Sequence, residues 1–499
     1  MIWPYNNRHL QLGIYESILR FDKDLTLAPQ LASSWELKPD SVVLKIRRGV
    51  KWHEPAAGEL TAQDVVFTLE DGRKEGNKKL GEVITPFYGA ITAVDDFTVR
   101  MEIKLPHVRW MSTLTTLLDG NAPISSKRLF DLLGPEKYNI TANGTGPFKV
   151  VEQVSDDRIV TEAVVPHWRK TPGFARVYTL EVPEEATRIA MLQTGEADII
   201  SVTVTQAAKV KSTPRLKLVT GQQTIGSPGV NVFLAGQWYS KTKKDGTPTG
   251  YVPATERPWV GNPDDAASME RARKVRWAMA LAVDRQAIID TILAGQACSA
   301  YVLWIDSCHP RWQEKWKFSY DTAKAKALLA EAGYPSGFEY PLFIPTGVSP
   351  VLEEVGVALI TMWERIGLKA KVEKAAYSAK RPLMLTRKFD MAWVWNHSDA
   401  GIPIGFVSNW GFFTAGTVWT PCCQFPWIES YYEKLGTTLN EQEQWALIME
   451  WVEKTHFEMP SVQIASFVSP WGMGPKASWT PLYHSSWWPV DLEFAVPAS

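Results

Sequence analysis

Strand and helix signals alternate along the second half of the chain, and this order restricts the possible fold more than any other sequence feature. A strand is expected at 338–344, a helix at 351–366 that ends at Gly367, and another strand at 368–372. The strand expected at 389–395 is apolar almost throughout, as is typical of a strand buried on both faces. Strands that alternate with helices indicate a mixed sheet covered by helices. The second half is therefore predicted to be an α/β lobe.

The first 165 residues show a mixed α+β pattern. Strands are expected at 42–47, 91–94 and 99–105, and a helix is expected to begin after Thr61. Thr61 is a good N-cap residue, and Asp64 stands where the positive end of the helix dipole favours a carboxylate.

Two further stretches have helical periodicity. Apolar residues recur at helical spacing in 10–21, and 271–293 is expected to be one long amphipathic helix that Ala294 and Gly295 end. Residues 236–268 are rich in Lys, Gly, Thr, Pro and Asp, which is typical of a surface crossover near a domain boundary.

The length and the charge limit the class of protein. A chain of 499 residues corresponds to about three domain-sized units. Lys and Arg number 53 and Asp and Glu 54, so a net charge of −1 provides no global field for nucleic acid or anionic membrane. No apolar run reaches the roughly 18 residues of a spanning helix. The first ten residues lack the pattern of a secretory signal, so an exported form is expected to have lost its signal.

Residues with catalytic or metal-binding chemistry are scattered along the chain. The eight histidines form no HExxH or comparable pair, and CxxC, GxSxG and phosphate-loop patterns are absent. Because no nucleophile–base pair is visible, the sequence predicts no enzyme, no metal site and no cofactor.

The four cysteines form two close pairs in the sequence. Cys298 and Cys308 flank a loop-like stretch, so a disulfide between them is plausible in an oxidising compartment. Buried free thiols are the alternative. Cys422 and Cys423 are adjacent and follow Pro421, and the sequence assigns them no role.

Five blocks resemble the extracytoplasmic solute-binding proteins of ABC importers, family 5, of peptide and nickel type. The first is LAPQLASSWELKPDSVVLKIRRGVKWHEPAAGELTAQDVVFTLE at 27–70. The others, in the order of the family, are NGTGPFKVVE (143–152), VPEEATRIAMLQTGEADII (182–200), RKVRWAMALAVDRQAIIDTILAG (273–295) and YDTAKAKALLAEAGYPSGFE (320–339). Most of these residues are interpreted as framework, and His53 as a structural hydrogen-bonding residue.

The resemblance implies an α/β fold, a two-lobed periplasmic-binding-protein clamshell of type II in its large cluster C form. An extra α+β subdomain would be inserted in the first lobe. The implied boundaries are 1–36 and 165–258 for the first lobe, 37–164 for the subdomain, 259–470 for the second lobe and 471–499 for a C-terminal return to the first lobe.

The same resemblance implies a transport receptor. Its ligand, of the di- or oligopeptide class, would bind in the cleft between the lobes, and hinge closure would bury it before delivery to an ABC permease in the membrane. The protein would be a monomer outside the cytoplasm, periplasmic or lipid-anchored, without nucleic acid or cofactor. A hydrolase on the same fold is the remote alternative.

Asp399 is the candidate anchor for a peptide's amino group. Peptide binders of the family typically place an Asp, followed by Pro, in the loop after the strand that matches 389–395. Here Ala400 follows Asp399. The departure leaves loop capping open as the alternative role of this carboxylate.

An excess of tryptophan points to an aromatic wall in the ligand site. The chain has 23 Trp, more than its 19 Phe or 15 Tyr. Trp395 and Trp410 are the more plausible platforms, whereas Trp393 is better interpreted as core. Indole rings and neutral amides also suit an oligosaccharide or another neutral or aromatic solute. The residues expected to contact ligand are Trp395, Asn396, Asp399, Trp410, Trp393, Tyr5, Asn6, Trp304 and Trp487.

Overall fold

The chain divides into two compact units, Met1–Thr224 with Ser469–Ser499 and Ile225–Val468. The division falls before residue 225, whereas the sequence predicts a boundary at 258. A separate subdomain at 37–164 stays a prediction. The computed structural model describes residues 13–22, 26–73, 84–85, 87–104, 107–108, 110–115, 123–155, 157–221, 228–243, 245–398, 401–417, 419–467, 470–481 and 491–498.

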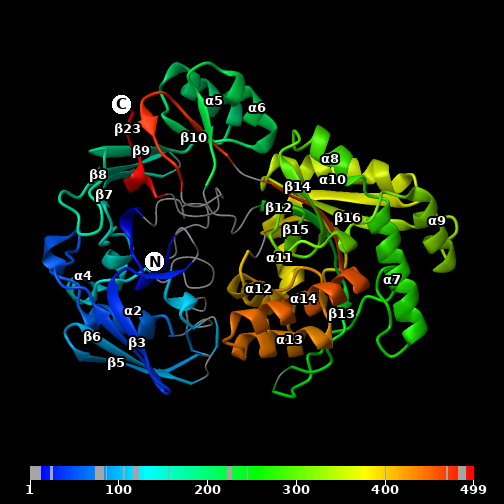
Figure 1. Cartoon of the computed structure of the whole chain (residues 1–499), viewed down its shortest axis with the longest axis horizontal. Coiled ribbons are helices and arrows are strands. Elements are labelled where there is room, and N and C mark those ends of the chain that lie inside the picture. The colour runs from blue at the N-terminus through cyan, green and yellow to red at the C-terminus, as the bar shows by residue number, and fades with distance from the viewer. Residues whose placement is uncertain are drawn as a thin grey trace. The chain divides into compact units, whose positions relative to one another are not determined.

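In its described residues, the first unit contains two larger antiparallel sheets, ordered β3-β4-β6-β5 and β7-β8-β9, and three small ones (Figure 1). The strands of the larger sheets are β3 (Ala32–Leu37), β4 (Ser41–Ile46), β5 (Tyr88–Asp95), β6 (Thr98–Ile103), β7 (Phe148–Val154), β8 (Arg158–Ala163) and β9 (Arg176–Leu180). The small sheets pair β1 (Leu19–Phe21) with β2 (Leu27–Pro29), β22 (Ala477–Ser478) with β23 (Val496–Pro497), and β21 (Trp471–Met473) with both β10 (Ile199–Ser201) and β11 (Lys217–Val219). The α-helices among the described residues of this unit are α2 (Ala62–Asp71), α4 (Lys127–Asn139), α5 (Glu185–Thr194) and α6 (Val204–Ser212).

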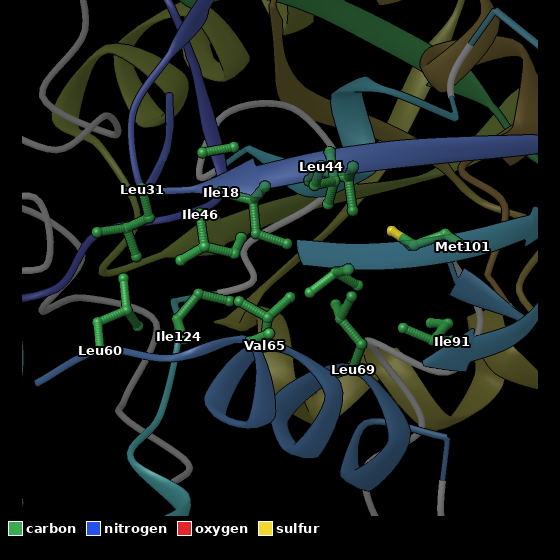
Figure 2. Close-up of a cluster of buried hydrophobic side chains, with 14 of the residues drawn as sticks. Ile18, Leu31, Leu44, Ile46, Leu60, Val65, Leu69, Ile91, Met101 and Ile124 are labelled. Carbon is green, nitrogen blue, oxygen red and sulfur yellow. The ribbon is translucent and has the colours of Figure 1, made fainter. Parts of the chain in front are cut away.

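Helix α2 covers one face of the four-stranded sheet. Figure 2 shows Val65 and Leu69 of the helix beside Leu44 and Met101 of the strands, and all four side chains are buried. The Thr61 backbone N–H donates to Asp64 Oδ2 at 2.8 Å, so the predicted start of this helix is confirmed.

The second unit is built on a seven-stranded mixed sheet. Its order is β15-β14-β20-β12-β18-β16-β17, and a separate parallel pair joins β13 to β19. The strands are β12 (Pro228–Leu234), β13 (Gln237–Trp238), β14 (Ala297–Val302), β15 (Ile305–Asp306), β16 (Glu339–Thr346), β17 (Lys369–Ala376), β18 (Ala392–Ser398), β19 (Cys423–Gln424) and β20 (Ser461–Phe467).

Helices pack on this sheet and on one another. Helix α10 contacts β16, β17 and β18, helix α7 contacts β20, and α12, α13 and α14 pack together. Their bounds are α7 (Ala266–Leu281), α8 (Arg285–Thr291), α9 (Thr322–Glu331), α10 (Pro350–Glu364), α11 (Tyr377–Leu385), α12 (Pro403–Trp410), α13 (Pro426–Thr437) and α14 (Glu441–Glu458). None of the helices among the described residues is long and apolar enough to cross a bilayer.

Two expected helices are corrected. The stretch 271–293 is not one helix, because α7 ends at Leu281 and α8 begins after Asp284, whose side chain accepts from Ala287 N. Within 10–21, Leu19–Phe21 is a strand that pairs antiparallel with β2, so the helical spacing of its apolar residues was misleading there. The side-chain cap of Asp284 in the first place and strand pairing with β2 in the second outweigh the periodicity of the apolar side chains.

Candidate ligand-binding site on the second unit

Three strands of the second unit end at the same edge of its sheet. Strands β17 and β18 both run parallel to β16, with Thr346 opposite Ala376 and Phe343 opposite Trp393. Their carboxyl ends therefore lie together, and Trp395 is two residues further toward that edge than Trp393. In open α/β sheets, ligands bind outside the carboxyl ends of the strands.

An aromatic ring pair occupies this carboxyl edge. Tyr377 is the first residue of α11, directly after β17, and its ring centroid lies 4.7 Å from that of Trp395. Both side chains are half-buried. Two partly exposed rings in contact can present apolar surface to a ligand.

Trp393 lies below this pair as part of the core. Its side chain is fully buried, its ring is 5.0 Å from that of Trp395, and its Nε1 donates to the Pro421 carbonyl at 2.9 Å. Phe233 and Phe389 also contact its ring. The geometry agrees with the interpretation of Trp393 as a core residue that supports Trp395.

Two buried amides lie beside Trp395 on the sheet. Asn231 of β12 pairs with Trp395 of β18 on one side and with Gln463 of β20 on the other. Residues directly opposite each other share a face of the sheet. Within the described part of the chain, neither amide atom of Asn231 nor Oε1 of Gln463 has a hydrogen-bond partner, although both side chains are buried.

Such groups are costly in a folded protein. An unsatisfied buried polar group costs about 1–3 kcal/mol, and each instance in a native protein calls for an explanation. Asn231, Gln463, Trp395 and Tyr377 are hereafter called the edge cluster. It combines apolar rings with unused donor and acceptor capacity, a combination typical of small-molecule sites.

Asn396 and Trp395 lie on opposite faces of the sheet. Successive side chains of a strand alternate between faces, and Asn396 pairs with Val230 rather than with Asn231. Asn396 therefore does not face the edge cluster, and its predicted ligand contact stays a prediction.

Trp304 and Trp410 are placed in the core of the helical layer. Trp410 is fully buried and its ring stacks on that of Trp451 at 4.9 Å, and Trp304 stacks on the same ring at 5.1 Å. Both rings are buried against other aromatic side chains, and their predicted ligand contacts stay predictions. Some of the many tryptophans therefore fill the core of the second unit.

The other predicted contacts lie outside the described residues. These are Tyr5, Asn6, Asp399 and Trp487. Their predicted roles stay predictions.

Sequence reasoning missed Tyr377, Asn231 and Gln463. A signal existed for Asn231, which is the one polar residue within the apolar run Val230–Leu234. Tyr377 could not be found without the strand register, since it lies 18 residues before Trp395.

His53 of the first unit has a structural role. Gly144 N donates to its Nδ1 at 3.3 Å, so Nε2 carries the proton and donates to the Gly146 carbonyl at 2.8 Å. Burial lowers the pKa of His53 to about 4. The imidazole is neutral at pH 7, as a bridging hydrogen-bonding residue requires.

Of the two alternatives for Cys298 and Cys308, the structure contains the disulfide, with the two Cα atoms 5.8 Å apart. Asp306 lies beside the two sulfur atoms, and the three residues form the one group of potential metal ligands among the described residues. Because both sulfurs are bonded to each other, this group is unsuited to a metal ion.

A family model and several curated relatives match the chain. The model described as bacterial extracellular solute-binding proteins, family 5 Middle, matches residues 26–417. Heme-binding protein A of Haemophilus influenzae is 28% identical over 383 residues, which cover 71% of this chain and 63% of that protein. The dipeptide-binding protein of Escherichia coli is 27% identical over 385 residues, which cover 72% of this chain and 65% of that protein. The matches thus span less than two thirds of these relatives' own length.

Solved structures share the fold over nearly the whole chain. The periplasmic binding protein DppA of Helicobacter pylori, in complex with the peptide STSA, has a TM-score of 0.75 at 20% identity and covers 98% of this chain and 93% of its own. The binding protein AgaA of A. tumefaciens, in complex with agropinic acid, has a TM-score of 0.76 at 21% identity and covers 99% and 95%. NikA of Brucella suis, in complex with Fe(III)-EDTA, has a TM-score of 0.77 at 18% identity and covers 99% and 96%. The predicted periplasmic-binding-protein fold is thereby confirmed.

Proposed function

This chain belongs to family 5 of the bacterial extracellular solute-binding proteins, and on that premise we propose that it is the substrate-binding receptor of an ABC importer. It captures a solute outside the cytoplasm and delivers it to a membrane permease. The observation that carries the binding site is the contact between Trp395 and Tyr377 at the carboxyl edge of three parallel strands. Closure of the protein around the solute follows from the family resemblance and stays a prediction.

The favoured solute is a di- or oligopeptide. The Escherichia coli relative is a dipeptide-binding protein, and the Helicobacter pylori structure holds a peptide. A peptide backbone offers N–H and C=O groups, which would satisfy the unused amide atoms of Asn231 and Gln463. An apolar side chain of the peptide would stack on the Trp395–Tyr377 pair.

A neutral oligosaccharide or aromatic small molecule is the second candidate. The four side chains of the edge cluster carry no charge, and an indole ring stacks equally well on the apolar face of a sugar or on another ring. The solved structures of this fold bind ligands as different as agropinic acid and Fe(III)-EDTA, so the fold itself does not select peptides.

Thermal shifts separate the two candidates. The purified protein is heated with di- to pentapeptides, with neutral oligosaccharides and with small aromatic acids. A ligand that binds only the native state stabilises it by about 2.7 kcal/mol at a hundred times Kd. We expect a shift with peptides. A shift confined to sugars or to aromatic acids would replace the peptide by the second candidate, and no shift in any of the three panels would contradict both.

Asn231→Leu tests the edge cluster directly. Leu branches at Cγ as Asn does and is larger, but it has no polar atoms, so it removes a buried unsatisfied amide from the ligand-free protein. We expect the melting temperature without ligand to stay level or rise and the affinity for the solute to fall at least tenfold. Asn231 would be a structural residue if the variant lost stability and kept its affinity.

A further inference from the structure

Two adjacent cysteines lie buried in the second unit. They directly follow Pro421, whose carbonyl accepts the indole N–H of Trp393. Cys422 and Cys423 are both fully buried, and their Sγ atoms are 3.1 Å apart. Side chains that follow each other in a regular strand point to opposite faces. Cys422 lies in a bend just before β19, and this bend lets the two sulfurs meet.

Hydrogen bonds hold this segment on both sides. Gln237 N of β13 donates to the Cys422 carbonyl at 3.2 Å, and Thr420 Oγ1 donates to the Cys423 carbonyl at 3.2 Å. The preceding Pro421 carbonyl accepts the indole N–H of Trp393. The backbone that carries the two thiols is therefore held by hydrogen bonds, and one of them comes from Trp393, whose ring contacts that of Trp395.

The surroundings favour a covalent bond over a metal site. Among the described residues, no third His, Cys, Asp or Glu joins these two thiols in a group suited to a metal ion. The same unit contains the disulfide between Cys298 and Cys308, and disulfides persist in oxidising compartments.

We propose that Cys422 and Cys423 are joined by a vicinal disulfide in the exported protein. The thiolate of one cysteine attacks the disulfide of an oxidising protein, which yields a mixed disulfide and one released thiol. The second cysteine then attacks the mixed disulfide and forms the Cys422–Cys423 bond. The two cysteines lose two protons and two electrons in total, and the oxidant is reduced to a dithiol.

The bond forms before the segment is buried. Burial raises the pKa of Cys422 well above its ordinary value, so the folded protein offers little thiolate at this position. The oxidant that closes the Cys298–Cys308 bond during folding is available at the same stage.

The vicinal bond is also the weaker of the two disulfides. Consecutive Cα atoms are about 3.8 Å apart, closer than the roughly 4.4–6.8 Å usual for disulfides, and such deviations make a disulfide easier to reduce. The Cα atoms of Cys298 and Cys308 lie 5.8 Å apart, within the usual range. In denaturant, where burial protects neither bond, a graded reductant therefore opens Cys422–Cys423 first.

Alkylation of exported protein tests the proposal. The protein is denatured without reductant, treated with iodoacetamide and mapped by peptide mass spectrometry. We expect no adduct on any cysteine before reduction and four after it. In a C298S/C308S variant the counts become zero and two, which isolates the vicinal pair.

Protein made under reducing conditions is the control and takes up four adducts without further treatment. Adducts on both Cys422 and Cys423 of exported, unreduced protein would overturn the proposal. So would a peptide in which either residue is cross-linked to Cys298 or Cys308. The mapping of the unmodified chain decides the question even if the variant fails to fold.

Discussion

At the scale of single residues, the candidate site is distinguished from the core by buried polar atoms that have no hydrogen-bond partner among the described residues. Asn231 and Gln463 lie buried beside Trp395 with unused amide atoms, whereas the indole N–H of Trp393 is satisfied by the Pro421 carbonyl. The two tryptophans of β18 are two residues apart and differ mainly in exposure. This difference separates a supporting ring from a ring that can meet ligand.

His53 makes the stability of the protein depend on pH. Its pKa is about 4 in the folded protein and about 6.5 in the unfolded chain, because burial disfavours the charged ring. The unfolded chain therefore binds the proton first as pH falls. The contribution of His53 to the free energy of unfolding is complete above pH 6.5, and it is lost as the pH falls from 6.5 to about 4.

His53→Gln tests this dependence, since an amide can also bridge Gly144 and Gly146 without titrating. We expect the free energy of unfolding of the wild type to fall more steeply between pH 7 and 4.5 than that of the variant, by up to about 3 kcal/mol. Urea titrations across this range measure the difference. Identical slopes would show that folding leaves the pKa of His53 unchanged.

Arg169 joins two buried carboxylates of the first unit. Its Nε donates to Glu16 at 2.8 Å and its Nη1 donates to Glu493, and both glutamates are almost fully buried. Removing one partner of a buried ion pair costs about 3–5 kcal/mol, because a charge is left unpaired. We expect Arg169→Met to lower the unfolding free energy by about that amount in denaturant titrations. A change below 1 kcal/mol would mean that the glutamates are protonated or solvated.

At the scale of elements, caps decide where helices begin. Apolar residues continue through Ala282 and Val283, yet Asp284 accepts from Ala287 N and starts α8 as a separate helix. We expect Asp284→Ala to destabilise the protein by about 1 kcal/mol, and Asp284→Asn, which keeps the cap, by much less. Melting temperatures of the two variants measure this. Equal losses would show that the charge matters rather than the hydrogen bond.

Elements whose signals are local could be predicted from the sequence. The strands near 338–344 and 368–372 and the helix between them were found, and so was the capped start of α2. The end of α7 at Leu281 could not be predicted from periodicity, because the spacing of apolar residues does not reveal that Asp284 caps a new helix. Strand β18 begins at Ala392 rather than Phe389, since only its later residues pair with β12.

The candidate site could be predicted only in part, because it depends on pairing between distant segments. Trp395 follows from its place at a strand end. Asn231 and Gln463 are separated by more than 200 residues and meet through the register of β12 and β20. The burial of Trp304 and Trp410 by the packing of α12 and α14 could not be predicted, because sequence periodicity does not show which neighbour covers a ring.

At the scale of the whole molecule, family membership and the edge cluster lead to the same function. The family match spans residues 26–417, and the fold likeness extends over nearly the whole chain. The proposed receptor needs no reacting groups. It needs a site whose interactions with the solute are stronger in one state of the protein than in another.

The most direct test of this account is the affinity of Trp395→Ala for the solute that the thermal shifts identify, measured by calorimetry. Tyr377→Ala is measured alongside it, and Phe457→Ala serves as control, since that ring is exposed on α14 and is not part of the edge cluster. We predict a loss of tenfold or more, about 1.4 kcal/mol, for each edge variant and none for the control. Unchanged affinity in both edge variants, with the fold intact, would contradict the assignment of the solute to this edge of the sheet.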